Sequence, residues 1–373
     1  MQRHWLAQLL MFLLFMICIG PQTAISKESA LGRIDKIEGT VTITRSDGQE
    51  VQGEVGLSLA AGDQIATGEG SRVSFSLLEG SSFRLGEKTQ VSVDELSNSD
   101  EEDDQPMLRL ALGYLWSKLQ KVKGSSGKIN VVTPTAIVGV RGTEFETVVS
   151  LDASSAIVVD EGTLEVSSDE DKVIVDKGKM TEVEFAKKPT PPVASIAKEQ
   201  RDWSAWRRKR VERLYNNLPQ LAPKFKNRFE RAVVRSRRFT ARVNEKADEI
   251  KKTIEENRQA RRERDRQRFM QSRDKLREDF GEFRDMVKKF RQGMNRVRAM
   301  SKLSRGVEQF AAENKQRFSE EDLASIESNL AVIAQKRQQL RRIYRRTVQN
   351  VRETFRELRA FRDEMRDLRK GRG

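Results

Sequence analysis

Hydrophobic and polar positions follow two different periods along the chain, and the change falls near residue 195. Before it, short runs alternate apolar with polar residues, and β-branched side chains are common in them. The clearest runs are 39–44, 72–77, 89–93 and 163–167. Gly and Asp separate the runs, as tight turns between short antiparallel strands require. The pattern predicts an all-β domain over residues 30–186, either solenoid-like or barrel-like.

After residue 195, apolar residues recur every three and four positions, which predicts long amphipathic helices. One such seam contains Leu276, Phe280, Phe283, Val287, Phe290, Met294 and Val297. Another contains Ile326, Leu330, Ile333, Leu340, Leu358, Phe361, Met365 and Leu368. Seams of this kind bury against a partner helix, so we predict an all-α coiled-coil region over residues 195–373. An antiparallel hairpin within one chain and a parallel dimer both satisfy the pattern.

Proline and capping residues predict where the helices begin and end. A first stretch, 195–218, ends at Pro219 and Pro223. Pro223 also suits the first position of a second helix, which we expect to run past residue 300. Ser319 precedes three acidic residues and predicts the N-terminus of a third helix.

The two regions also differ in charge, which favours separate modules. Residues 201–373 contain 50 Lys and Arg against 26 Asp and Glu, whereas the first 200 residues contain 20 against 30. Between them, residues 187–194 are rich in proline, which stiffens a linker. We therefore predict an α+β protein with an all-β domain, a linker and a basic helical region.

The first 26 residues have the three parts of a secretory signal peptide. Arg3 precedes an apolar run over 5–19, and small residues precede a cleavage point after Ser26. We predict an exported, periplasmic protein, with an uncleaved inner-membrane anchor as the alternative. Cleavage would remove Cys18 and His4, the single cysteine and histidine of the chain. The mature protein would then lack a thiolate nucleophile, a catalytic triad and His-ligated metals, and we expect no cofactor.

Several short motifs follow one another through the β-rich region. Their characteristic residues are Gly62, Asp63, Gly80, Thr133, Pro134, Arg141, Gly142, Thr143, Phe145 and Gly162. In this order, over roughly residues 35–180, the motifs resemble the FecR-type periplasmic domain. The resemblance implies an extracytoplasmic, non-catalytic β module used in envelope signalling or binding. Turn chemistry alone also accounts for the glycines and for Thr133-Pro134.

The sensor proteins of that family carry an anti-sigma segment before a membrane helix, whereas four residues precede the apolar run here. The resemblance therefore implies the module without direct control of a sigma factor. We expect a non-enzymatic envelope protein that binds or scaffolds partners through its β module and helices. The second alternative, after the electrostatic tether described below, is an enzyme acting on glycans, which without His or Cys would depend on paired carboxylates. The candidates for such a pair are Glu144, Glu146, Asp160 and Glu161.

The basic charge of the helices has two interpretations. One is a solvated coiled-coil surface that binds an envelope protein or a second copy of the chain. The other is an electrostatic tether to anionic lipid, lipopolysaccharide or a wall polymer, with Trp203 and Trp206 at the surface. The same tryptophans could instead anchor a helical core. Nucleic acid is not expected as a partner, because export separates the protein from it.

Overall fold

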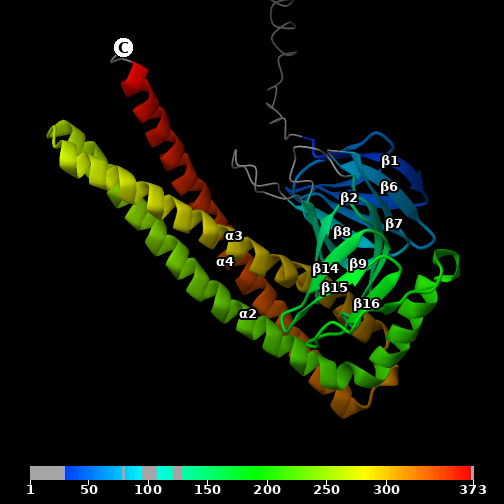
Figure 1. Ribbon diagram of the computed structural model, residues 1–373. Coiled ribbons are helices and arrows are strands. Elements are labelled where there is room, and N and C mark those ends of the chain that lie inside the picture. The colour runs from blue at the N-terminus through cyan, green and yellow to red at the C-terminus, as the bar shows by residue number, and fades with distance from the viewer. Residues whose placement is uncertain (1–29, 78–79, 95–106, 121–127, 371–373) are drawn as a thin grey trace, which may run out of the picture.

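The computed structural model describes residues 30–77, 80–94, 107–120 and 128–370, and the predicted signal peptide lies outside these ranges. A β module holds the N-terminal part, and three long helices run beneath it and extend beyond it (Figure 1). None of the helices in the described ranges is long and apolar enough to span a membrane.

The β module consists of two sheets that share one strand. Sheet A contains β1 (Gly32–Glu38), β4 (Ser58–Leu59), β6 (Arg72–Leu77), β7 (Ser81–Leu85), β12 (Glu144–Val149), β13 (Ser155–Glu161), β16 (Lys179–Val183) and β17 (Val193–Ala194). Sheet B contains β2 (Val41–Thr44), β3 (Glu50–Gln52), β5 (Gln64–Thr67), β8 (Gln90–Asp94), β10 (Lys128–Val132), β11 (Ile137–Arg141), β14 (Thr163–Ser167) and β15 (Lys172–Asp176). The shared strand is β9 (Met107–Lys118).

Strand β9 changes sheet at Gly113. Its first half pairs with β8 and β10, and its second half pairs with β7 and β12. Gly113 has a φ of +102°, and a Cβ there would lie 2.3 Å from the Oγ1 atom of Thr89. Only glycine combines this backbone conformation with so close an approach. One residue therefore lets a single strand join both sheets.

The strands predicted from the alternating pattern are confirmed as β2, β6, β8 and β14. The chain passes repeatedly from one sheet to the other as it advances, which agrees with the solenoid-like alternative. The barrel-like alternative is wrong for the described residues, because β3, β4, β15 and β17 each pair on one side only and leave the sheets open.

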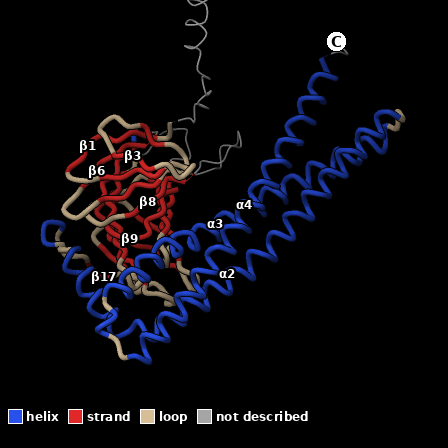
Figure 2. Tube along the Cα trace, turned by 180° about the vertical axis from the view of Figure 1, so that it is seen from behind, coloured by secondary structure: helices blue, strands red, loops and turns tan. Residues whose placement is uncertain are grey.

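The helical region consists of α2 (Trp203–Arg262), α3 (Arg266–Glu313) and α4 (Glu320–Lys370), with short 3₁₀ turns η2 (Lys198–Gln200) and η3 (Lys315–Arg317). The colours of Figure 1 show that α3 returns antiparallel to α2 and that α4 runs parallel to α2, and Figure 2 shows the same three helices from behind. Thr240 of α2 meets Thr347 of α4 at 2.8 Å between their hydroxyl oxygens, and Asn350 of α4 donates to Asn244 of α2. The α2–α3 and α3–α4 pairs are both antiparallel within one chain.

Two predicted helix boundaries are wrong. Helix α2 continues through Pro219 and Pro223, and its first part runs in a different direction from the rest in Figure 1. Proline kinks or breaks a helix. Here the helix bends without ending, because the neighbouring side chains Leu218 and Ala222 are fully buried and hold it in place. The long second helix instead ends at residue 262, because Arg264 adopts a φ of +57° and Asp265 caps α3.

The third predicted helix begins where its capping residue indicates. The Ser319 hydroxyl accepts a hydrogen bond from the backbone N–H of Asp322 at 3.1 Å. Gly306 lies inside the preceding helix, α3. A Cβ on Gly306 would approach the Cδ1 atom of Leu151 to 3.0 Å, so this glycine lets α3 pack closely on the β module.

Candidate interaction site between the β module and the helices

A cluster of ionised side chains joins the β module to the start of the helical region. We call Glu144, Glu146, Asp160, Lys198 and Arg201 the junction network. Arg201 has only 5% of its side chain exposed, and Glu146 only 4%. The Arg201 guanidinium lies 2.8 Å from Asp160 and 3.3 Å from Glu146. A buried pair of this kind strongly disfavours separation, because either partner alone would be left as an uncompensated charge.

Strand alternation presents the two glutamates to the helices. Side chains on a strand alternate between its faces, so Glu144 and Glu146 share the face opposite Phe145. Phe145 is fully buried in the core. Lys198 contacts Glu144 at 2.7 Å, and Lys118 contacts the other oxygen of Glu144 at 3.1 Å.

Burial opposes ionisation of the Glu144 carboxyl, but hydrogen bonds from Lys198 and Lys118 outweigh it and lower the pKa of Glu144. A carboxyl held ionised in this way is poorly suited to act as a general acid.

Aromatic side chains enclose the junction network with polar edges directed at the carboxylates. The indole N–H of Trp203 donates to Glu146 at 2.6 Å, and the indole N–H of Trp116 donates to Glu144 at 3.2 Å. The hydroxyl of Tyr114 donates to the second oxygen of Glu146 at 3.2 Å. Burial, followed by the charge of Glu146, raises the pKa of Tyr114. The phenol therefore remains a proton donor to this carboxylate.

A second ionic cluster lies within the first two turns of α2. Arg210 has 9% of its side chain exposed and pairs with Glu182 and, at 2.9 Å, with Glu184. The indole N–H of Trp206 donates to Glu182 at 2.9 Å, and the Arg210 guanidinium stacks over the Trp206 ring. Arg207 donates to the backbone carbonyl of Glu87 at 3.1 Å. The first two turns of α2 are thus fixed to three parts of the β module.

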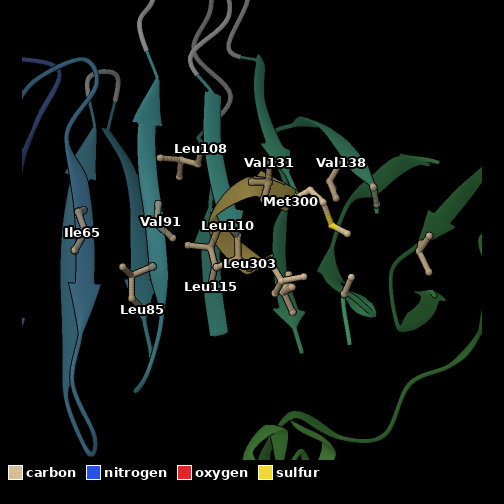
Figure 3. Packing of buried hydrophobic residues seen from close by; sticks show 14 of the residues in the cluster. Ile65, Leu85, Val91, Leu108, Leu110, Leu115, Val131, Val138, Met300 and Leu303 are labelled. Carbon is tan, nitrogen blue, oxygen red and sulfur yellow. The ribbon is translucent and has the colours of Figure 1, made fainter. Parts of the chain in front are cut away.

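Apolar packing continues across the same boundary. Phe185 of the β module meets Phe225 of α2 edge to face, with ring centroids 4.5 Å apart. Met300 and Leu303 of α3 belong to the same hydrophobic cluster as the sheet residues Leu110 and Val131, among which Figure 3 shows them. Burial of such side chains is the main stabilising term in folding. The two modules therefore share a single core.

The structure brings some of the predicted motif residues to this boundary. Gly142, Thr143 and Gly162 lie beside the junction network, and a Cβ on Gly162 would come within 2.5 Å of the Cγ2 atom of Thr143. Glu144 of β12 pairs in register with Glu161 of β13. The side chain of Arg141 lies outside the described residues. These contacts fit the turn interpretation of the motif.

The remaining motif residues lie elsewhere in the β module. Asp63 is fully buried and accepts hydrogen bonds from Arg45 at 2.6 Å and from the N–H of Ala60 at 2.9 Å. Gly62 and Gly80 have φ values of +90° and +75°, as tight turns require.

A buried cluster of hydroxyl groups holds the Thr133-Pro134 motif. The Thr133 hydroxyl accepts from the backbone N–H of Ala136 at 2.9 Å and from the Ser155 hydroxyl at 2.8 Å. Thr133 therefore has structural partners, and the functional role of the motif residues stays a prediction.

Three of the four carboxylates considered for an enzyme are engaged in the junction network. Glu144, Glu146 and Asp160 each contact a cation, whereas Glu161 is exposed. No group of acidic, His or Cys side chains in the described ranges could hold a metal ion. The sequence did not reveal Lys198 and Arg201 as the partners. The sequence did contain one signal for this contact: Glu144 and Glu146 lie on the same face of a strand, and Lys198 and Arg201 follow the linker closely.

The helical seam residues lie mostly between the helices. Phe283, Val287, Phe290, Ile326, Leu330, Ile333, Leu340 and Phe361 are buried. Phe280 is partly exposed and meets Phe355 of α4 at 6.1 Å between ring centroids. Leu358 and Met365 are also partly exposed, and Leu368, near the C-terminal end of α4, is 44% exposed. The seam is thus buried along most of its length and opens at its end.

Residues 63–192 match the protein family described as FecR protein. The matched residues cover the β module from β5 to β16, whereas β1 to β4 lie before them. The match ends at residue 192, within the segment 187–194 that the sequence predicted as a linker. This segment contacts the sheet. The Thr190 N–H donates to the backbone carbonyl of Glu182 at 2.8 Å, so this part of the linker is held against β16.

Solved structures with similarity to this chain include two crystal structures, at 1.65 and 2.50 Å resolution, of a protein described as an anti-sigma factor from Parabacteroides distasonis ATCC 8503. Each is 19% identical to this chain, with a TM-score of 0.32. The matched region covers 38% of this chain and 63% of the solved chain. A structure described as a cell surface anchoring domain is 28% identical, with 17% of this chain and 83% of that chain covered and a TM-score of 0.17. No curated protein matches the chain.

Proposed function

We propose that this protein is an exported, non-enzymatic FecR-domain scaffold of the bacterial envelope, in which the β module and the helices act as one rigid body. The observation that carries the proposal is the junction network. Two nearly buried, oppositely charged side chains from separate modules pair directly, and a shared apolar core continues around them. Modules joined only by a flexible linker would not need such contacts.

A rigid body of this form suits partner binding better than chemistry. Three of the four candidate carboxylates, Glu144, Glu146 and Asp160, hold the modules together, so they are not available to a substrate in this arrangement. The long helices instead present an extended surface at a fixed angle to the FecR domain. We propose that an envelope protein binds this surface, within a signalling system, and that the apolar run at 5–19 directs the chain out of the cytoplasm.

The scaffold function is tested by capturing partners from the envelope of cells that export the full chain, with the Arg201→Met variant alongside. A partner that binds both modules should be captured by the wild type and reduced at least several-fold with Arg201→Met. The control is Arg208→Met, whose side chain is 68% exposed and which should capture the partner as the wild type does. Equal capture by all three proteins would contradict a role for the docked arrangement.

The enzyme alternative has its own test. Glu144→Gln and Glu146→Gln together would abolish hydrolysis of a glycan substrate if these carboxylates were catalytic. We expect that the wild type hydrolyses no glycan, so that the variant has no activity to lose. Glycan hydrolysis by the wild type that disappears in this variant would contradict the scaffold proposal.

A further inference from the structure

Acidic residues are absent from three stretches of the helices that carry many cations. Residues 231–244 of α2 contain five Lys and Arg, and residues 286–307 of α3 and 328–352 of α4 contain seven each. No Asp or Glu occurs in any of the three. Acidic residues resume on both sides, at the turns and toward the C-terminal end. We call these three stretches together the basic belt.

The register of the helices places the three stretches at one level. Phe239 of α2 stacks on Phe290 of α3 with ring centroids 5.6 Å apart. Phe290 in turn stacks on Tyr344 of α4 at 6.1 Å, and Thr240 meets Thr347 at 2.8 Å. The stretches are far apart in the sequence, yet they surround the same section of the bundle. Their cations therefore add to one local positive potential.

Some cations of the belt are neutralised within the molecule. Arg296 pairs with Asp169 of the β module at 2.8 Å, and Arg337 pairs with Glu308 at 2.9 Å. The pKa of Arg305 is lowered, first by burial and then by the charges of Arg337 and Arg341. Among the charged neighbours, Arg337 and Arg341 each lower the pKa of Arg305 more than Glu308 raises it.

Four arginines on α4 stay exposed and without an acidic partner in the described part of the chain. They are Arg341, Arg342, Arg345 and Arg346. Because they fall within six residues, they occupy about two turns of the outer side of the helix. Val234 is the one large apolar side chain that the belt exposes among the described residues. The surface is suited to electrostatic adhesion and lacks the apolar face needed for insertion into a bilayer.

We propose that the arginines of the belt on α4 bind the anionic headgroups of a lipid surface. Guanidinium groups bind phosphate oxygens in a bidentate manner, and a row of them along one helix matches a plane of phosphates. Lipid is the occupant favoured here because the apolar run at 5–19 is predicted to bring the chain to a membrane. The choice of lipid as the occupant rests on the proposed export of the protein. Binding to anionic vesicles is measured in vitro, so its outcome does not depend on whether a protein partner is captured.

The test is sedimentation of the full chain with vesicles of phosphatidylcholine alone and with about 30% phosphatidylglycerol. Binding through the N-terminal apolar run would occur equally on both vesicles and at any salt concentration. The belt should add binding to the anionic vesicles only. This added binding should be lost as the salt rises from about 0.05 M to about 1 M, because screening then acts over about 3 Å.

The variant Arg341→Gln, Arg342→Gln, Arg345→Gln, Arg346→Gln should lower the affinity for anionic vesicles by roughly 1,000-fold. The control changes the net charge equally at four exposed cations that have acidic partners: Lys252→Gln, Arg262→Gln, Arg273→Gln, Arg366→Gln. It should lower the affinity much less. Replacement of the four belt arginines by lysine should retain most of the binding.

Three results would overturn the proposal. Equal losses in the belt variant and the control would show that net charge alone matters. Unchanged binding in the belt variant, with its helix content intact by circular dichroism, would show that another surface binds lipid. A belt that binds duplex DNA with a loss in the variant, while vesicle binding is unaffected, would assign it to nucleic acid.

Discussion

Arg201 is the residue on which the junction depends most, because its guanidinium bridges Glu146 and Asp160 while only 5% of it is exposed. Removing one member of a buried ion pair costs about 3–5 kcal/mol. We predict that Arg201→Met lowers the free energy of unfolding by about 3 kcal/mol in urea denaturation. Arg208→Met, at a side chain 68% exposed, should change it by less than about 0.5 kcal/mol. Similar values for the two variants would contradict the importance of the network.

Glu144 makes the junction sensitive to acid. Its pKa is lowered in the folded protein, since hydrogen bonds from Lys198 and Lys118 outweigh the opposing effect of burial. A carboxyl with a depressed pKa stabilises the fold above its unfolded pKa of about 4.3, and this contribution is lost as the pH falls through the folded pKa.

We therefore predict that the stability of the wild type declines below about pH 4.5 and that Glu144→Gln declines less steeply in the same range. Stability is measured by urea denaturation between about pH 3 and pH 7. Parallel pH profiles for the two proteins would show that Glu144 is not one of the responsible groups.

At the scale of elements, the bend of β9 depends on Gly113. Its φ is +102°, and an added Cβ would meet the Oγ1 atom of Thr89 at 2.3 Å and its Cα atom at 2.5 Å. Gly48 has a similar φ of +98° but open space around it. We predict that Gly113→Ala costs more than about 3 kcal/mol, whereas Gly48→Ala costs about 1–2 kcal/mol from backbone strain alone. Thermal unfolding of both variants measures the difference, and equal costs would contradict the steric argument.

The helical seam offers a second prediction at this scale. Ile333 is fully buried, whereas Leu368 at the open end of the same seam is 44% exposed. Ile333→Ala should destabilise the protein by about 2–4 kcal/mol, because it leaves a cavity. Leu368→Ala should have an effect below about 0.5 kcal/mol. Chemical denaturation measures both, and a large effect at Leu368 would indicate that a partner or a second chain covers this end.

Much of the element structure followed from the sequence, because local pattern and local chemistry determine it. The alternating runs became strands, and the Ser319 cap marked the start of α4. The errors arose where distant contacts override a local preference. Pro219 and Pro223 predicted a break, but buried neighbours keep α2 continuous there. Arginine is not a residue that favours a positive φ, so the sequence does not mark Arg264 as the turn. Backbone hydrogen bonds from the N–H of Arg264 to Arg261 and from the N–H of Asp265 to Ala260 form this turn.

At the scale of the whole molecule, the sequence predicted two modules but did not predict how they meet. The opposite charges of the two regions were visible. The pairing of cations with carboxylates depends on the position of β12 relative to α2. A single sequence does not reveal this position. Glu144 and Glu146 were therefore considered as candidate catalytic groups, whereas the structure uses them to hold Lys198 and Arg201.

The chain offers a direct test of whether the two modules form one body. Three of its four tryptophans, Trp116, Trp203 and Trp206, lie at the junction, so tryptophan fluorescence reports its opening. Far-ultraviolet circular dichroism at the same time reports the helices. Both signals can be followed during urea unfolding of the same sample.

We predict that the two transitions coincide in the wild type and separate in Arg201→Met, where fluorescence changes at a lower urea concentration than helix content. A fluorescence transition that precedes loss of helix content in the wild type itself would contradict the central claim, because the junction would then be a loose contact between independent modules.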